Sequence, residues 1–198
     1  MISIVVPVFN EEENMEAFYQ AVCSVMEKLP HSFELIFVDD GSKDATPLVI
    51  DRLSQQDSRV RGLILARNFG HQIALSCGLD HAEGDAVVTM DGDLQHPPEC
   101  VAQIIERFEE GYEVINMVRT RNKTAGLVKN ITSSGFYWLI NRISDVHFEA
   151  NASDFFAVSR HVAQVLKDSY REKVRFLRGY VQNVGFKKTA IEYEARAR

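Results

Sequence analysis

The strongest constraint on the fold is a repeated alternation of short apolar runs with segments of helical periodicity. Residues 2–8 form a continuous apolar run, as expected of a strand buried on both faces of a sheet. A helix follows, with apolar residues on one stripe from Met15 to Leu29 after an acidic first turn. The alternation continues with predicted strands at 33–38, 60–65, 86–90 and 113–118, and helices at 45–53, near 72–81 and after Pro97-Pro98. This pattern predicts a doubly wound α/β fold with a mainly parallel sheet.

The pattern changes after residue 118. Residues 119–126 are polar and basic and predict a loop. Residues 127–143 predict an amphipathic helix whose apolar positions are too many for one narrow stripe, so this helix is either deeply packed or partly meets lipid or another chain. The remaining predictions are a short strand at 155–158, a helix at 162–166 and a closing strand at 184–193. Without an internal repeat or a linker, residues 1–198 are expected to form a single domain.

Composition excludes several classes of protein. The chain has 198 residues, 45% hydrophobic and 25% charged, which is typical of a globular domain and argues against a disordered or fibrous chain. Three cysteines without C-x-x-C spacing favour neither a disulfide scaffold nor a structural zinc site, and fit a reduced cytoplasmic setting. No apolar run approaches the roughly 18 to 20 residues of a membrane span.

Charge is divided unevenly along the chain. Residues 1–116 carry a formal charge of −14 and residues 117–198 carry +8. This asymmetry predicts two kinds of partner, a cation on the acidic side and an anion or a membrane surface on the basic side. The alternative is that solvated charged faces happen to cluster. Nucleic acid is disfavoured, because the acidic half would repel a polyanion and the basic residues are not interleaved with aromatic residues for stacking.

Two acidic motifs follow predicted strands. Asp91 and Asp93 lie two apart, so in a regular strand both would point to one face, and Gly92 would let the backbone approach a ligand. Their oxygens, with Gln95 as a further donor, suit Mg²⁺ or Mn²⁺, which often bridges substrate phosphates. A turn built on Asp-Gly-Asp is the structural alternative.

The second acidic motif is Asp39-Asp40-Gly41-Ser42. Its carboxylates can accept hydrogen bonds from ribose hydroxyls or a base N–H, or can serve a turn and the start of the next helix. Neither G-x-G-x-x-G nor G-x-x-x-x-G-K-[ST] occurs, which disfavours dinucleotide and P-loop sites. Any phosphate bound here would therefore depend on a metal rather than on a glycine-rich loop.

Taken together, the motifs resemble glycosyltransferase family 2, the inverting enzymes of GT-A fold. The matching segments are Val6-Pro7-Val8-Phe9-Asn10-Glu11, Val38-Asp39-Asp40-Gly41-Ser42, Arg67-Asn68-Phe69-Gly70 and Asp91-Gly92-Asp93-Leu94-Gln95-His96-Pro97-Pro98. The last segment is most similar to the polyprenyl-phosphate branch, which includes dolichol-phosphate mannosyltransferases and bactoprenol glucosyltransferases. Similar segments later in the chain are 136–146, 151–155 and 175–179, so the resemblance covers nearly all of it.

The resemblance implies a UDP- or GDP-sugar as donor, a polyprenyl (dolichyl or undecaprenyl) phosphate as acceptor, and Mg²⁺ or Mn²⁺ as cofactor. The donor half would be 1–118 and the acceptor half 119–198. Donor-binding residues would be Pro7, Phe9, Asn10, Glu11, Val38, Asp39, Asp40 and Asp91, with the metal on Asp91, Asp93 and Gln95. The acceptor phosphate would meet Arg119, Lys129, Ser133 and Arg175, and Asp154 would face the sugar as a catalytic residue together with Asp93.

These residue types suit a single displacement that inverts the anomeric carbon. A lipid phosphate is already anionic and needs no strong base, so Asp154 is expected to orient sugar hydroxyls. Two other functions stay open: transfer to a glycan or lipopolysaccharide hydroxyl, which would require a true base, and a non-catalytic nucleotide-sugar binding domain. One departure from the branch is Phe156, which stands where Arg is common and removes a charge near the sugar or phosphate site.

Further expectations concern the surroundings of the site. The basic segment 171–180 predicts either a solvated helix face or a lid over the phosphates that also rests on anionic headgroups. The histidines show no metal-ligand spacing and are expected to cap helices or pack. Members of the branch often carry transmembrane helices beyond the catalytic domain, which implies an anchor after residue 198 and a location on the cytoplasmic side of a membrane. A homo-oligomer is compatible with the sequence.

Overall fold

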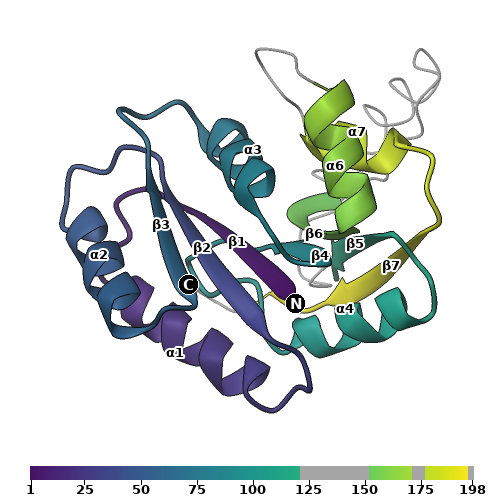
Figure 1. Ribbon diagram of the computed structural model, residues 1–198, viewed down its shortest axis with the longest axis horizontal. Helices are drawn as coiled ribbons and strands as arrows, with labels where there is room; N and C mark the ends of the chain where they lie inside the picture. Colours follow the sequence, from purple (N-terminus) through teal and green to yellow (C-terminus); the bar gives the residue numbers. More distant parts are fainter. Residues whose placement is uncertain (121–151, 171–176, 196–198) are drawn as a thin grey trace, which may run out of the picture.

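The computed structural model describes residues 1–120, 152–170 and 177–195, which form one sheet covered by helices on both faces (Figure 1). The strands are β1 (Ile2–Val8), β2 (Phe33–Asp39), β3 (Val60–Ile64), β4 (Ala86–Thr89), β5 (Val114–Arg119), β6 (Ala152–Ser159) and β7 (Lys188–Tyr193). Their order in the sheet is β3-β2-β1-β4-β6-β5-β7. Among these strands only β6 runs against its neighbours, β4 and β5. The prediction of a mainly parallel α/β sheet is therefore confirmed.

The helices form two layers, one on each face of the sheet. They are α1 (Met15–Met26), α2 (Thr46–Gln56), α3 (His71–His81), α4 (Cys100–Glu109), α6 (Arg160–Ser169) and α7 (Leu177–Asn183). Buried side chains of α1, α2 and α4 pack in one core cluster, and those of α3, α6 and α7 pack in a second cluster on the other face. Figure 1 shows the two groups on opposite sides of the strands.

The central strands are buried along their whole length because both faces are covered. All seven residues of β1 and all seven of β2 are buried, which explains the continuous apolar runs in the sequence. Strand β3 lies at the edge, and its residues alternate between buried or half-buried and more exposed positions. Each buried Val, Leu, Ile or Phe side chain contributes about 1.5 to 3 kcal/mol through the hydrophobic effect.

The second half of the chain differs from the sequence predictions in three places. The short strand expected at 155–158 is the longer β6, which inserts antiparallel between β4 and β5. The closing strand begins at Lys188 rather than at residue 184. Helix α7 buries Leu177 and Val181, so it is not a wholly solvated helix. The expected helix at 127–143 and residues 171–176 lie outside the described residues.

The strand order reverses between β1 and β4. The chain proceeds from β1 to β2 and β3 on one side, and β4 then pairs with the other side of β1. In open α/β sheets the connections after such strands diverge to opposite faces and leave a crevice at the carboxyl ends. Glu11, which follows β1, and the Asp91–Asp93 motif, which follows β4, lie at this crevice.

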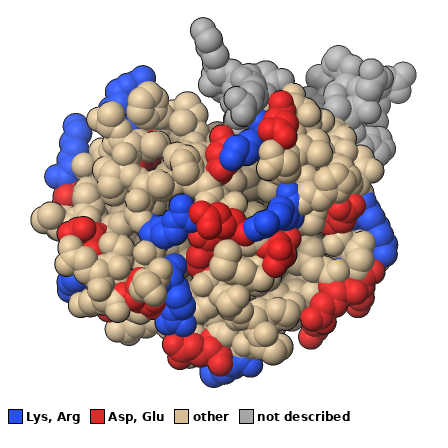
Figure 2. Space-filling view, in the orientation of Figure 1, with Lys and Arg blue, Asp and Glu red and all other residues tan. Residues whose placement is uncertain are grey.

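The uneven charge along the sequence does not produce a surface of one sign on the face seen in Figure 2. Basic and acidic side chains lie next to one another there. Ion pairs within the acidic half are one cause of such mixing; for example, Arg61 Nη1 lies 2.8 Å from Glu34 Oε2 and 3.1 Å from Glu83 Oε1. Within the described residues, no helix combines the length and the apolarity needed to cross a membrane.

Candidate active site

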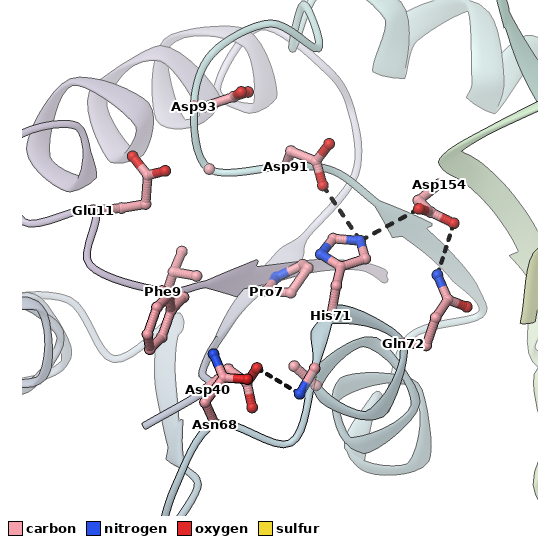
Figure 3. A pocket seen from close by; sticks show the side chains of 14 residues that line it. Pro7, Phe9, Glu11, Asp40, Asn68, His71, Gln72, Asp91, Asp93 and Asp154 are labelled. Carbon is pink, nitrogen blue, oxygen red and sulfur yellow. Dashed lines mark hydrogen bonds and ion pairs between the residues drawn. The ribbon is translucent and has the colours of Figure 1, made fainter. Parts of the chain in front are cut away.

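A cavity of about 630 Å³ opens at the carboxyl ends of β1 and β4 (Figure 3). Seven residues singled out from the sequence line it: Pro7, Phe9, Glu11, Asp40, Asp91, Asp93 and Asp154. Asn68 and Gly70 of the Arg67–Gly70 motif line it as well, together with His71 and Gln72, which the sequence did not place at the site. The cavity thus collects five carboxylates from four different segments of the chain, which is an arrangement suited to a cation or to hydroxyl groups.

The turn after β1 is tied to the turn after β2. Asn10 has a left-handed backbone, with φ of 54°. Its N–H donates to Ser42 Oγ at 2.8 Å, and its side-chain Oδ1 accepts from the N–H of Lys43 at 2.9 Å. Asn10 therefore shapes the rim, and it is not among the residues that line the cavity.

Two other predicted donor-binding residues are buried below the cavity. Val38 is 0% exposed and packs in the core on the α3 side of the sheet. Asp39 is also 0% exposed, and its carboxylate accepts from the N–H and the hydroxyl of Ser42. The structural interpretation of the Asp39–Ser42 pair as a turn therefore accounts for its contacts.

Asp40 holds the loop that forms the opposite wall of the cavity. Its Oδ1 accepts from the N–H of Phe69 at 2.7 Å, and its Oδ2 accepts from the N–H of Gly70 at 2.8 Å. The residue is only 4% exposed, so both bonds are shielded from water. Because Gly70 immediately precedes α3, Asp40 also fixes where α3 begins. Figure 3 shows Asp40 beside Asn68 and Phe9 at one end of the cavity.

The Asp-Gly-Asp motif follows β4 as a turn. Strand β4 ends at Thr89, so the alternation of a strand is not what brings Asp91 and Asp93 to the cavity. A Cβ on Gly92 would lie 2.9 Å from Val8 Cγ1, closer than side chains normally approach. Glycine is therefore required by the close packing of this turn on β1. Close approach of a ligand to Gly92, which also lines the cavity, stays a prediction.

Electrostatics at Asp91 are dominated by burial. Desolvation raises the pKa of Asp91 above its ordinary value, the nearby His96 and His71 oppose the rise, and the carboxylates Asp93 and Asp154 add to it. The charged forms of these carboxylates repel one another in the cavity. A divalent cation would relieve that repulsion.

Two histidines contact Asp91, and only one behaves as a packing residue. His96 is 6% exposed and its ring stacks on Phe155 at a centroid distance of 4.7 Å, as expected for packing. Its Nδ1 accepts from the N–H of Asp91 at 2.9 Å, so Nε2 carries the hydrogen, and Nε2 lies 3.5 Å from Asp91 Oδ2. Burial lowers the pKa of His96 and favours this neutral form.

His71 corrects the expectation that the histidines only cap or pack. It is the first residue of α3 and lines the cavity. Its Nε2 lies 3.6 Å from Asp91 Oδ1 and 3.6 Å from Asp154 Oδ2 (Figure 3). The sequence signal that could have found it is its place directly after the Arg67–Gly70 motif, although its partners come from β6 and the turn after β4.

The other predicted residues that the structure describes are not brought to the cavity. Gln95 donates its backbone N–H to Asp93 Oδ1 at 3.1 Å, and it is not among the lining residues. Arg119 is exposed at the end of β5 and does not line the cavity either. Phe156 is 2% exposed and belongs to the core under α3, α6 and α7. Lys129, Ser133 and Arg175 lie outside the described residues.

The carboxylates of Asp91 and Asp93 fit a divalent metal ion whose remaining ligands come from a substrate. In residues 1–120, 152–170 and 177–195, no group of three or more His, Cys, Asp or Glu side chains is arranged to hold a metal ion. Asp91 and Asp93 nevertheless present carboxylates to one cavity. Mg²⁺ and Mn²⁺ commonly take one or two protein carboxylates and fill their other positions with water and phosphate oxygens. The site therefore suits such an ion only together with a phosphate-bearing ligand.

The sheet order and the acidic cavity at its reversal define the α/β GT-A fold of glycosyltransferases. A solved structure of that class is similar over 96% of this chain and 54% of its own: the mannosyltransferase PcManGT from Pyrobaculum calidifontis in complex with GDP-Man and Mn²⁺, with a TM-score of 0.63 and 17% identity. Residues 3–173 match the description Glycosyl transferase family 2. The chain therefore belongs to glycosyltransferase family 2.

Curated relatives are closer in sequence. The uncharacterized glycosyltransferase YkcC of Bacillus subtilis is 44% identical over 191 residues, which cover 96% of this chain and 59% of the relative. The bactoprenol glucosyl transferase of Shigella phage SfV is 42% identical over 192 residues, which cover 97% of this chain and 62% of the relative. The chain thus spans about three fifths of the length of these relatives.

Proposed function

We propose that this chain transfers a hexose from a nucleotide diphosphate sugar to a polyprenyl phosphate, with inversion of the anomeric carbon in a single displacement. The observation that carries the proposal is the cavity at the β1–β4 reversal, where five carboxylates from four segments converge. Similarity to a bactoprenol glucosyl transferase at 42% identity favours glucose as the sugar and a polyprenyl phosphate as the acceptor.

The sugar donor would lie along the cavity, with its nucleobase near Phe9 and its diphosphate near Asp91 and Asp93. Phe9, 40% exposed at the rim, offers an aromatic face to a nucleobase, next to Asp40 and Asn68. Asp91 and Asp93 lie toward the other carboxylates, where the diphosphate would be held. In this orientation the sugar would lie near Asp154, which supports a role for Asp154 in orienting sugar hydroxyls.

A divalent cation, Mg²⁺ or Mn²⁺, is part of the proposal. Asp91 and Asp93 would hold it, and it would supply positive charge to the donor diphosphate as that group leaves. The Mn²⁺ in the complex of the mannosyltransferase PcManGT supports this assignment. Without such charge, an anionic acceptor and an anionic donor would repel each other in a cavity already lined by carboxylates.

The acceptor would approach from the second half of the chain. Its phosphate oxygen is anionic at neutral pH and can attack without a strong base. Arg119 is exposed at the carboxyl end of β5 and is a candidate for contact with the acceptor phosphate. Lys129, Ser133 and Arg175, which lie outside the described residues, remain proposals from the sequence. We further propose that residues 1–198 act as one catalytic domain at the cytoplasmic side of a membrane, since a polyprenyl acceptor resides in a bilayer.

Transfer to a short-chain polyprenyl phosphate tests the proposal directly. UDP-glucose, GDP-mannose and related donors would be tried with Mn²⁺ or Mg²⁺, and the product would be detected by mass spectrometry. Asp93→Ala should reduce transfer by about 100-fold or more, because a charge that stabilises the leaving group is worth several kcal/mol. Asp51→Ala, which changes an exposed carboxylate on α2, is the control and should retain activity.

Two outcomes would replace the proposal by its alternatives. Donor binding in calorimetry without transfer or hydrolysis, for any donor and acceptor, would indicate a nucleotide-sugar binding domain. Transfer to a glycan hydroxyl that is abolished by Asp154→Asn would indicate a hydroxyl acceptor, because that reaction requires a base. A phosphate acceptor predicts that Asp154→Asn keeps part of its activity.

A further inference from the structure

One side chain at the start of α3 connects the cavity to a distant helix. Gln72 is the second residue of α3 and lines the cavity. Its Nε2 donates to Asp154 Oδ1 at 2.9 Å, 82 residues further along the chain. Its Oε1 accepts from the N–H of Leu177 at 3.2 Å, 105 residues further along. A single carboxamide therefore links α3 to β6 and to the first residue of α7.

The two ends of the Gln72 carboxamide cannot be exchanged. An ionised carboxylate such as that of Asp154 only accepts hydrogen bonds, and a backbone N–H such as that of Leu177 only donates. The amide nitrogen must therefore face Asp154 and the amide oxygen must face Leu177. Among side chains of similar length in their usual forms at neutral pH, only glutamine offers both a donor and an acceptor in this arrangement.

Both oxygens of Asp154 are engaged by consecutive residues of α3. Oδ1 accepts from Gln72, and Oδ2 lies 3.6 Å from His71 Nε2 (Figure 3). The backbone of Asp154 is held separately, because Thr89 Oγ1 on β4 donates to its carbonyl oxygen at 2.6 Å. A carboxylate attached to a fixed backbone still rotates broadly about its last torsion unless its oxygens are bonded. The contacts from α3 restrict that rotation.

Gln72 also provides a hydrogen-bond acceptor for the first residue of α7. The first N–H groups of a helix have no partner within the helix, and Gln72 provides one for Leu177. Leu177 is 0% exposed and packs with α3 residues such as Leu75 in the same core cluster. The start of α7 is therefore held to α3 both by apolar packing and by this hydrogen bond.

We propose that Gln72 is a positioning residue, which sets the orientation of the Asp154 carboxylate toward the sugar and ties it to the start of α7. The inference rests on the proposed function, in which Asp154 orients the sugar of the donor. Gln72 then acts through Asp154 and does not itself touch the reacting atoms. A change at either end of the bridge is transmitted to the other, so ordering of the sugar site and ordering of α7 are coupled.

Two substitutions separate the two bonds. Gln72→Glu keeps an oxygen that accepts from Leu177. In its ionised form it also loses the donor to Asp154 and brings a second carboxylate against it. Gln72→Met has a similar length and loses both bonds. Gln164→Met is the matched control, because Gln164 on α6 also donates to a carboxylate, Asp168 Oδ2 at 2.7 Å, but is exposed and remote from the cavity.

The expected result is a split between binding and turnover. Both Gln72 variants should lower kcat by about 10- to 100-fold, since a misplaced orienting group costs roughly that much, while the donor Kd changes by less than about threefold. Amide exchange at Leu177 should quicken by about tenfold or more in Gln72→Met and stay near the parent rate in Gln72→Glu. Gln164→Met should match the parent protein in all three measurements.

Several results would overturn the proposal. Unchanged kcat in Gln72→Glu would show that the bond to Asp154 has no role in turnover. Equal loss of donor binding and turnover would show collapse of the site rather than positioning. If the parent chain transfers no sugar, only the proposed function fails. The Gln72 link between Asp154 and Leu177 is then tested by hydrogen exchange. Donor binding should slow exchange of the Leu177 amide in the parent chain and not in Gln72→Met. Absence of that difference would refute the bridge.

Discussion

Replacing Asp40 tests whether the wall of the cavity is built by one buried carboxylate. In Asp40→Ala, the N–H groups of Phe69 and Gly70 lose their acceptors, which lie at 2.7 and 2.8 Å in the folded chain. The carboxylate is 4% exposed, so water does not readily replace it. The loop before α3 is then no longer fastened to the end of β2.

The magnitude follows from the two lost bonds. Hydrogen bonds to a charged group contribute about 1.5 to 3 kcal/mol each, which gives about 3 to 6 kcal/mol for the pair. Part of this is offset, because the folded state no longer carries a desolvated charge. We expect a net loss of about 2 to 4 kcal/mol in the free energy of unfolding, a large share of the 5 to 15 kcal/mol typical of a domain.

Urea denaturation followed by circular dichroism measures this loss. With a slope of about 2 kcal/mol per molar urea, the midpoint should fall by about 1 to 2 M. Asp40→Asn should fall between the parent and Asp40→Ala, because the amide oxygen can still accept one bond. Asp51→Asn on α2, where the carboxylate is exposed, is the control. A midpoint for Asp40→Ala within error of that control would refute the reasoning.

Three further predictions concern other parts of the chain. Gly92→Ala should reduce donor binding and destabilise the fold by about 1 to 3 kcal/mol, because the added Cβ would lie 2.9 Å from Val8 Cγ1. Calorimetry measures the donor binding, and urea denaturation measures the stability. A variant that matches the parent in both would contradict the packing argument. The hydrogen bonds from Arg59 lower the pKa of Asp57 to about 2 from an ordinary 3.8. The free energy of unfolding should therefore be highest above about pH 4 and should decline by about 1 to 2 kcal/mol toward pH 2. Asp57→Asn should remove this pH dependence in acid titrations of unfolding. Chelation of divalent ions should abolish sugar transfer, and added Mn²⁺ or Mg²⁺ should restore it; full activity in excess chelator would exclude a metal-dependent reaction.

The fold of the first half could be predicted because its signals are local. A strand covered on both faces must be apolar throughout, and the helices between strands show one apolar stripe, so β1, β2 and α1 are visible in the sequence. The antiparallel insertion of β6 was not visible. Its place between β4 and β5 depends on pairing with strands more than 30 residues away, which no local pattern records.

The candidate site was predicted in part for a similar reason. Polar residues at the carboxyl ends of β1, β2 and β4 mark the crevice, and Asp40, Asp91 and Asp93 indeed line the cavity. Val38 and Asp39 share the same motif but are buried, because the motif does not show which side chains face the crevice. The side chain that faces it is decided by how the following turn packs.

The amino-acid sequence by itself determined the α/β alternation, the acidic motifs and the family to which the chain belongs. Only the tertiary structure decided that His71 and Gln72 join Asp91 and Asp154, since these residues are close in space but separated in sequence by as many as 83 positions. The physical reason is that residue type and periodicity report burial and local conformation, whereas the order of strands is set by the packing of the whole sheet. That order brings the beginning of α3 against β6 and makes one site of five separate segments.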